Sequence, residues 1–332
     1  MPQTFARTQV GVREDLADLI SLIDQKTTPL LTSAPRGKEL VNVRFDWQAD
    51  SYDPPDTSGV IDGSDVSQTQ DAAKNRARLY GMCQRQWQTP KVSNFTDITD
   101  VAGVGRGKEM ARAIMKCSTQ LKRSVEATLC SDNSSQEDNG TVEYKTRGLG
   151  EWIKATAQSH LPVDSNFLTP SASIDTTATG SLAISNINAV LQSQYNQTGS
   201  VNTYTLLVGQ AIKAAFTELV SYQGTRGGSS SILKTELGSA NAWEHNIQSF
   251  TGDFGTYDLV LSNWLGWNNT TKVPNLFRGY ALDMDMLELR MNTPWRVTKL
   301  PNLGGGERAI VEVVYGLMVK NPLGLAKFAA SS

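Results

Sequence analysis

The sequence predicts an α+β protein, and three stretches of the chain carry this prediction. Residues 37–50 alternate apolar and polar side chains, which is the period of a half-buried strand. Residues 107–130 carry apolar side chains at helical spacing. From Ser181 onwards, helical and strand patterns alternate over a stretch of domain size. The 332 residues suffice for a large core and for two or three compact units.

The chain is expected to open with a helix over residues 13–26. Its apolar residues fall on one helical face: Leu16, Leu19, Ile20 and Ile23. Glu14 and Asp15 occupy the first turn of this helix, where the helix dipole favours acids. Pro29 lies just beyond the last turn, which is typical of a helix end.

A strand is expected next, followed by a long acidic loop and a return strand. The apolar face of the first strand consists of Val41, Val43, Phe45 and Trp47. From Asp46 to Asp71 the chain contains seven aspartates and neither lysine nor arginine, and its prolines and glycines exclude regular structure over much of this stretch. The return strand, residues 76–88, carries Arg76, Arg78 and Arg85. Together these segments form a two-stranded excursion with an acidic tip.

Residues 107–130 predict the longest helix of the chain. Its apolar stripe consists of Met110, Ile114, Cys117, Leu121, Val125 and Leu129. The charged residues, Glu126 among them, lie mostly off this stripe. At 1.5 Å per residue the helix is about 35 Å long, so it is expected to be a structural beam. A polar loop follows it.

The second half of the chain predicts a mixed unit of helices and strands. Residues 185–195 are expected to form a short helix capped by Ser185. A strand ending at Gly209 and a helix over residues 210–219 follow. Two further strand patterns, at residues 243–250 and 257–264, are joined by a turn.

The C-terminal part returns to strand. Residues 308–319 are apolar on both faces apart from Glu312, which predicts a central position in a sheet. The chain is then expected to turn at Pro322 and to add a short final strand.

Composition excludes several classes of function. The formal net charge is -2 and the isoelectric point is about 5.8, whereas a specific nucleic-acid binder usually shows a basic balance or stripe. The N-terminus lacks the apolar core of a signal peptide, and the most apolar run is too short to span a bilayer. Three cysteines without metal-type spacing indicate reduced thiols. We therefore expect a protein made in a cytoplasm, with no membrane partner and no cofactor.

The motifs that resemble catalytic signatures are incomplete. Residues 102–109 lack the glycine and the hydroxyl residue of a phosphate-binding loop, because Ala102 and Glu109 stand at those positions. Asp253-Phe254-Gly255 spells a kinase triplet, but the His-Arg-Asp that a kinase also needs is missing, so a turn is expected. The two histidines of the chain exclude a His-rich metal site. The acidic loop lacks the ligand spacing of an EF-hand.

One pair of acids keeps an enzymatic alternative open. Asp283 and Asp285 have the spacing of the metal-nucleotide pair of glycosyltransferases. They also alternate with Leu282, Met284 and Met286, as acids do on the solvated face of a strand. The solvated strand is the interpretation preferred here, and a DxD-type glycosyltransferase is the alternative.

The aromatic residues of the excursion instead indicate contact with another copy of the chain. An isolated two-stranded hairpin is marginal in water and cannot bury tryptophans. Tryptophan, tyrosine and arginine are enriched in interface hot spots. The expected assembly residues are Arg44, Phe45, Trp47, Asp62, Asp65, Arg76, Arg78, Arg85 and Trp87. In this hypothesis the aromatic rings supply the apolar contact, and the charges set its register.

The order of these elements resembles that of the major capsid proteins of tailed bacteriophages. This fold is shared with herpesvirus capsids and was first described in a Hong Kong lambdoid phage. The local sequence is also similar to one family of phage major head proteins. The similar pieces are "TPLLTSAPRGK" from Thr28, "WQAD" at Trp47, "AGVGRGKEMARAIMKCSTQLKRSVEATL" from Ala102, "TRGLGEWI" from Thr146 and "YALDMD" at Tyr280.

The resemblance implies an α+β fold with five parts and no enzymatic activity. Residues 1–34 would form an N-terminal arm and residues 35–92 an extended two-stranded loop lying over the neighbouring subunit. Residues 93–180, with a spine helix at 108–130, would begin a peripheral domain, which residues 292–332 complete with closing strands. Residues 181–291 would form an axial α/β domain, whose Gly-rich loop at Arg226, Gly227 and Gly228 faces the five- and six-fold axes.

The resemblance also implies partners and a location. The subunits would assemble into pentamers and hexamers of an icosahedral head that encloses DNA without reading its sequence. The virion would be assembled in the host cytoplasm, with portal and decoration proteins as possible partners. The chain begins almost directly with the arm-like helix, so a separate scaffolding protein, or none, is expected. A tail or baseplate component is the alternative structural reading.

Overall fold

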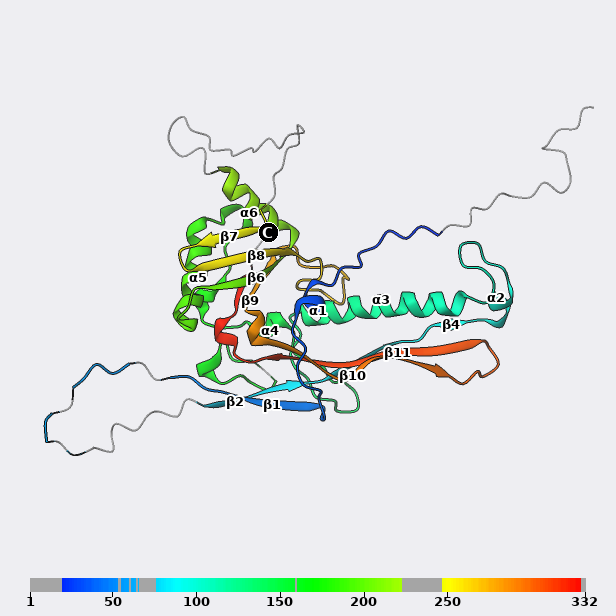
Figure 1. The fold of residues 1–332 in the computed structure, drawn as a ribbon, viewed down its shortest axis with the longest axis horizontal. Coiled ribbons are helices and arrows are strands. Elements are labelled where there is room, and N and C mark those ends of the chain that lie inside the picture. The colour runs from blue at the N-terminus through cyan, green and yellow to red at the C-terminus, as the bar shows by residue number, and fades with distance from the viewer. Residues whose placement is uncertain are drawn as a thin grey trace, which may run out of the picture. The chain divides into compact units, whose positions relative to one another are not determined.

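The computed structural model describes most of the chain (Figure 1). The chain divides into two compact units. The described residues are 20–52, 55–59, 61–63, 65, 76–158, 160–222 and 247–329. The smaller unit consists of Met1–Thr27, Trp87–Leu121 and Trp295–Glu312. The larger unit consists of Thr28–Gln86, Lys122–Pro294 and Val313–Ser332.

The core of the larger unit is a six-stranded sheet. Its strands, in spatial order, are β5 (Ile174–Asp175), β12 (Ala326–Ala329), β9 (Arg278–Leu282), β6 (Asn202–Val208), β8 (Gly255–Leu261) and β7 (Ser249–Gly252). Strands β6 and β8 are parallel, and β9 is antiparallel to β6. This sheet shares one apolar core with α5 (Ile184–Thr198) and α6 (Gln210–Tyr222).

Periodicity places the side chains of this core. On α6, Ile212, Ala215 and Phe216 are buried, as their helical spacing predicts. The ring of Phe216 meets that of Phe328 on β12 edge to face, with centroids 6.0 Å apart. The strand predicted up to Gly209 is β6, and the turn predicted at Asp253-Phe254-Gly255 joins β7 to β8.

Two local predictions in this unit are wrong. Ser185 does not cap α5, because the helix begins one residue earlier, at Ile184, and its N-cap residue is Ala183. At its other end, α5 is capped by Gly199, whose left-handed backbone conformation (φ +67°) suits glycine. Asp283 and Asp285 do not alternate along a strand, since β9 ends at Leu282 and a 3₁₀ turn follows at Met284–Met286.

The predicted excursion consists of two strands, β1 (Arg44–Ala49) and β2 (Ala77–Met82), which pair antiparallel. The return segment was expected to be one strand, but it breaks at Cys83 into β2 and β3 (Gln84–Gln88). The reason is a change of sheet: the Cys83 amide still bonds to the Val43 carbonyl at 2.8 Å, whereas β3 pairs with β11. Val41 and Val43 precede β1 and are exposed.

The other long strands are β10 (Leu287–Leu300) and β11 (Glu307–Val319). Strand β11 lies between β10 and β3 and also pairs with β4 (Lys91–Val92), so its predicted central position is confirmed. The predicted turn at Pro322 is a 3₁₀ helix, Pro322–Gly324, and the final strand is β12. Further 3₁₀ helices occur at Ser165–Phe167, Ser171–Ser173 and Thr179–Ser181.

The long helix is confirmed as α3 (Glu109–Leu129), with Leu121, Val125 and Leu129 buried. The short helices are α1 (Pro29–Ser33), α2 (Asn94–Ile98) and α4 (Leu149–Trp152). Cys83, Cys117 and Cys130 are free thiols, as expected. Within the described part of the chain, no helix is both long and apolar enough to cross a bilayer.

The helix predicted over residues 13–26 is wrong for its described part. Residues 20–28 have no regular structure, and the first described helix begins at Pro29; residues 13–19 lie outside the described residues. Ile20, Leu22 and Ile23 are exposed, and Ile20 alone among them lies against a glycine, Gly103, so little of the stripe is packed against the described part of the chain. A short helix without such packing is marginal in water.

Candidate assembly surfaces

The apolar face of the β1–β2 hairpin is formed by Phe45 and Trp47, which pair with Gly81 and Leu79 on β2. The Phe45 ring lies over two glycines: a side chain at Gly81 or at Gly316 of β11 would collide with it. Phe45 is therefore 8% exposed. Two distant glycines create the hollow that receives this ring.

Trp47 is fixed by three contacts with its own chain. Its ring stacks on Phe45 at a centroid distance of 5.8 Å and tilts against Trp152 at 5.7 Å. Its indole Nε1 donates a hydrogen bond to the Lys320 carbonyl at 3.1 Å. The surrounding apolar cluster contains Leu40, Cys83, Val314 and Met318.

These contacts correct the premise that the hairpin cannot bury its tryptophan within one subunit. The hairpin is not isolated, because β11 and Trp152 lie against its apolar face. The expectation that a second copy covers Phe45 and Trp47 is therefore wrong for most of their surface. Period-two alternation correctly identified the apolar face of β1, but it could not say which segment covers that face.

The polar face of the hairpin pairs its own charges. Asp46 accepts hydrogen bonds from Arg44, at 3.1 Å, and from Arg78. The Arg44 guanidinium also lies over the Tyr80 ring, 4.3 Å from its centroid. Arg76 pairs with Asp50 at 3.3 Å. Two of the three return-strand arginines therefore already have partners inside the hairpin, where each exposed pair contributes about 0–1 kcal/mol.

The other predicted assembly residues lie outside β1 and β2. Asp62 and Asp65 are exposed in the segment that follows β1. Arg85 and Trp87 are exposed on β3, and Trp87 keeps 57% of its surface accessible. Arg226, Gly227 and Gly228 lie outside the described residues.

An apolar surface that the sequence analysis missed lies in the smaller unit. Phe95 and Ile98 on α2 are 81% and 58% exposed, and Leu303 between β10 and β11 is 80% exposed. Strand β4 leads into α2 and pairs with the start of β11, which places α2 beside the β10–β11 turn (Figure 1). We call these three side chains the apolar tip. The i, i+3 spacing of Phe95 and Ile98 was the available signal.

The small core behind the apolar tip contains Val92, Met110 and Ala309. Ser93 caps α2, because its side-chain oxygen accepts a hydrogen bond from the Thr96 amide at 3.2 Å. The cap and the β4–β11 pairing hold α2 in place, while its apolar side chains face solvent. A fixed helix with exposed aromatic and aliphatic side chains is typical of a protein interface.

A second feature missed by the sequence analysis is the buried acid Glu126 on α3. Its carboxylate has no exposed surface and accepts hydrogen bonds from the amides of Leu30, at 2.8 Å, and Leu31, at 2.7 Å. Glu126 thus satisfies two otherwise unpaired amides at the start of α1. Burial raises the pKa of Glu126 to about 7, although the two backbone hydrogen bonds oppose that shift.

The remaining motifs that resemble catalytic signatures have structural roles. Asp283 caps the 3₁₀ turn at Met284–Met286 by accepting a hydrogen bond from the Asp285 amide at 3.0 Å. Asp253 and Phe254 form the turn of the β7–β8 hairpin. Within the described ranges, no three His, Cys, Asp or Glu side chains gather as metal ligands.

A sequence model of the SU10 major capsid protein matches residues 2–331, nearly the whole chain. The chain belongs to this family. The resemblance inferred from the order of its elements is thereby confirmed, and the protein is a structural capsid protein of bacteriophage virions. A search of curated sequences found no match.

Solved structures similar to this SU10-family protein are phage-type capsids. The capsid of a native GTA particle has a TM-score of 0.63 at 15% identity, and the alignment covers 99% of both chains. The capsid of cyanophage P-SCSP1u has a TM-score of 0.60 at 10% identity, covering 97% of this chain and 93% of that one. The capsid of Myoviridae phage XM1 has a TM-score of 0.58 at 12% identity, covering 99% of both.

These matches confirm the predicted fold class and favour the capsid reading over the alternatives. A tail or baseplate component and a DxD-type glycosyltransferase would belong to other families, whereas the capsid family accounts for almost every residue. The subunit therefore belongs to a homo-oligomeric shell and is located in the virion. Membership of a capsid family indicates a structural rather than a catalytic role.

Proposed function

We propose that this capsid protein forms pentamers and hexamers that close into an icosahedral head around packaged DNA. The observation that supports this proposal most directly is the apolar tip of Phe95, Ile98 and Leu303, which no other part of the described chain covers. Ten of the eighteen large apolar side chains that are exposed in the described residues lie in the smaller unit, so that unit needs a partner most. A closed shell supplies the partner as further copies of the chain.

In the proposed subunit, the arm is residues 1–34 and the extended loop is residues 35–92. The peripheral domain begins with residues 93–180, including the spine helix at 108–130, and closes with residues 292–332. Residues 181–291 form the axial domain, with Arg226, Gly227 and Gly228 near the symmetry axis. The apolar tip belongs to the peripheral domain in this division.

The hairpin acts in this proposal as a rigid base for the extended loop. Phe45 and Trp47 fix the base on its own subunit, so the neighbouring subunit meets the outward side. The exposed residues proposed to meet the neighbouring subunit are Asp62, Asp65, Arg85 and Trp87. Exposed charges contribute little to affinity but restrict how two copies can align. We therefore assign register to the charges and affinity to the apolar tip and Trp87.

Further partners follow from the geometry of a closed shell. Heterologous contacts alone do not fix shell size, so a separate scaffolding protein is proposed to set curvature. A portal and decoration proteins are proposed to complete the head, and assembly is proposed to take place in the host cytoplasm. The DNA is enclosed without sequence-specific binding, which agrees with the net charge of -2.

Substitution of the apolar tip tests this proposal. Purified wild-type chain, alone or co-expressed with a scaffolding protein, is expected to form rings or closed shells in negative-stain electron microscopy and sedimentation. Phe95→Ser with Ile98→Ser is expected to leave subunits that fold but remain unassembled. The matched control is Val201→Ser with Val273→Ser, which removes two exposed valines from the larger unit.

Shells that form equally well from the tip variant would remove the apolar tip from the assembly contact. A wild-type chain that stays monomeric even with its scaffolding protein would contradict the proposal as a whole. Circular dichroism of the unassembled variant separates loss of assembly from loss of folding.

A further inference from the structure

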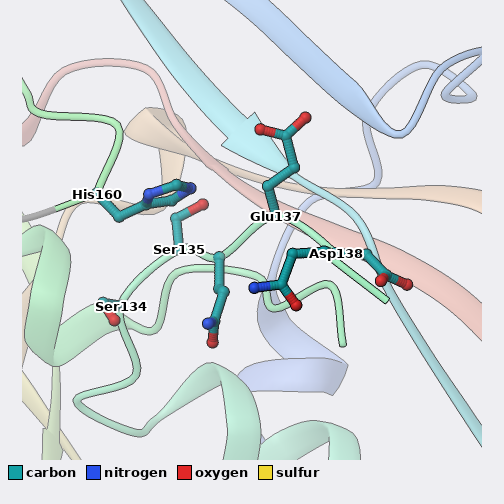
Figure 2. A pocket seen from close by; sticks show the side chains of 7 residues that line it. Ser134, Ser135, Glu137, Asp138 and His160 are labelled. Carbon is teal, nitrogen blue, oxygen red and sulfur yellow. The ribbon is translucent and has the colours of Figure 1, made fainter. Parts of the chain in front are cut away.

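A polar pocket in the larger unit has no assigned role. It is formed by the six consecutive residues 134–139, which follow α3, together with His160 (Figure 2). Its volume is about 560 Å³, within the range of small-molecule sites. All seven lining residues have polar or charged side chains.

The walls of the pocket are held in place by the rest of the unit. Gln136 and Lys145 exchange two backbone hydrogen bonds, at 3.1 and 3.0 Å, which fix the loop as a short hairpin. The buried Arg147 donates from Nη2 to the carbonyls of His160, at 2.8 Å, and Leu161. Its guanidinium also lies over the Trp152 ring, 4.4 Å from the centroid. The contacts of Arg147 therefore fix the backbone at His160.

Two buried polar groups in the pocket have unused hydrogen-bonding capacity. Ser135 has no exposed surface, and its hydroxyl has no hydrogen-bond partner among the described residues. The Nε2 atom of His160 is likewise buried and without a partner in that part of the chain. Figure 2 labels both side chains among the residues that line the pocket. Buried polar groups are nearly always paired in folded proteins, so this pair points to a ligand.

The lining is rich in hydrogen-bond acceptors and negative charge. Glu137 and Asp138 supply two carboxylates, and one oxygen of Asp138 accepts a hydrogen bond from the Gly140 amide at 2.7 Å. The Ser135 hydroxyl and the His160 imidazole can accept further hydrogen bonds. Neither lysine nor arginine lines the pocket. A ligand that fits this lining carries positive charge and several N–H donors.

Two basic groups lie near the pocket without lining it. Lys145 pairs with Glu143 at 3.3 Å. Arg147 bonds through Nη2 to backbone carbonyls and stacks on Trp152, while its Nε and Nη1 have no partner among the described residues. A divalent metal ion fits less well, because the described residues contain no group of three His, Cys, Asp or Glu side chains placed to bind one.

We propose that this pocket binds an organic cation of the alkylammonium or guanidinium class. The carboxylates of Glu137 and Asp138 balance the charge of the ammonium or guanidinium group, which donates to Ser135 and His160 after a small shift of the loop uncovers these two groups. Such a group is carried by free polyamines and by the lysine or arginine side chains of another copy of the chain. The two sources share one chemistry and differ in whether the pocket remains accessible after assembly.

Calorimetric titration of the full-length protein with spermidine tests the proposal. The wild type is expected to bind, and Ser135→Ala, which leaves the charge unchanged, is expected to bind several-fold more weakly. Glu137→Gln with Asp138→Asn is expected to weaken binding at least tenfold. The control is Glu218→Gln with Asp258→Asn, which removes the same charge from exposed sites of the larger unit outside the pocket and should leave binding unchanged.

Equal weakening in the control pair would overturn the proposal, because spermidine would then respond only to net charge. Absence of spermidine binding by wild-type subunits and shells alike would also overturn it. Binding by both subunits and shells supports a free amine as the ligand. Binding by unassembled subunits that disappears in shells supports a side chain of another copy. Because Ser135→Ala deletes one atom, a folded variant is available even if the double variant fails to fold.

Discussion

Single residues of this subunit decide contacts between segments that are far apart in the sequence. Glu126 joins the middle of the chain to residues near its start, since it lies on α3 and binds the first turn of α1. The Glu126 carboxylate is buried, and none of the groups that shift its pKa is a side-chain cation. The cost of burying that charge makes stability depend on pH.

The pH dependence has a definite sign. The folded-state pKa of Glu126 is about 7, above the 4.5 of an unperturbed glutamate, so the folded state binds the proton more tightly. The resulting stability is fully present below pH 4.5 and is lost as the pH rises through 7. The shift corresponds to a change on the order of 3 kcal/mol in the free energy of unfolding. Denaturant unfolding between pH 4.5 and 8 measures this slope.

Glu126→Gln is expected to flatten the slope, because the amide does not titrate. Glu218→Gln, an exposed acid on α6, serves as the control and should retain the wild-type slope. Identical slopes in wild type and Glu126→Gln would show that another group is responsible.

The hollow under Phe45 yields a second prediction at this scale. Gly81→Ala is expected to lower stability by about 1–3 kcal/mol, because the added methyl group collides with the Phe45 ring. Gly180→Ala is the control, since nothing lies within 4 Å of the added carbon there. Thermal unfolding compares the two. Phe45→Leu in the Gly81→Ala background should recover part of the loss, and a double variant no better than Gly81→Ala would argue against the collision.

At the scale of elements, the β1–β2 hairpin depends on its aromatic contacts with the rest of the larger unit. Phe45→Ala with Trp47→Ala removes the stack, the contact with Trp152 and the bond to the Lys320 carbonyl. We expect faster amide hydrogen exchange throughout β1 and β2, with β6 and β8 unchanged. Val43→Ala, an exposed position before β1, is the control. Unchanged exchange in β1 and β2 would mean that backbone pairing alone holds the hairpin.

Sequence patterns predicted the elements better than the contacts between them. The stripe of α3 and the continuous apolar run of β11 are local signals that the packed structure reinforces. The helix predicted over residues 13–26 had the same kind of stripe, but the apolar side chains of its described part stay largely exposed. Periodicity reports which face is apolar and says nothing about whether a partner surface exists.

For the assembly residues too, the sequence predicted which side chains are apolar but not what they contact. The alternation in β1 correctly marked Phe45 and Trp47 as apolar and correctly separated them from Arg44 and Asp46. What covers the two rings depends on Gly316 and Trp152, more than a hundred residues away, and no local pattern reports that. The apolar tip was missed because α2 is only five residues long, too short for a clear stripe.

For the whole molecule, the apolar tip predicts how assembly responds to temperature. The stabilisation that comes from burying apolar surface weakens on cooling. Shells or rings should therefore dissociate more readily near 4 °C than near 30 °C. Sedimentation at the two temperatures measures the shift. The control is Val201→Ser with Val273→Ser, which leaves the apolar tip intact and should show the same temperature effect as the wild type. Equal assembly of the wild type at the two temperatures would show that burial of the apolar tip does not drive assembly.

The hollow that receives Phe45 also limits how this protein can diverge among related viruses. Its walls are two glycines in strands β2 and β11, and its occupant is a phenylalanine in β1. A relative that gains a side chain at either glycine should carry a smaller residue at the position of Phe45. These three positions are therefore expected to covary in an alignment of the family, because all three contribute to the same contact.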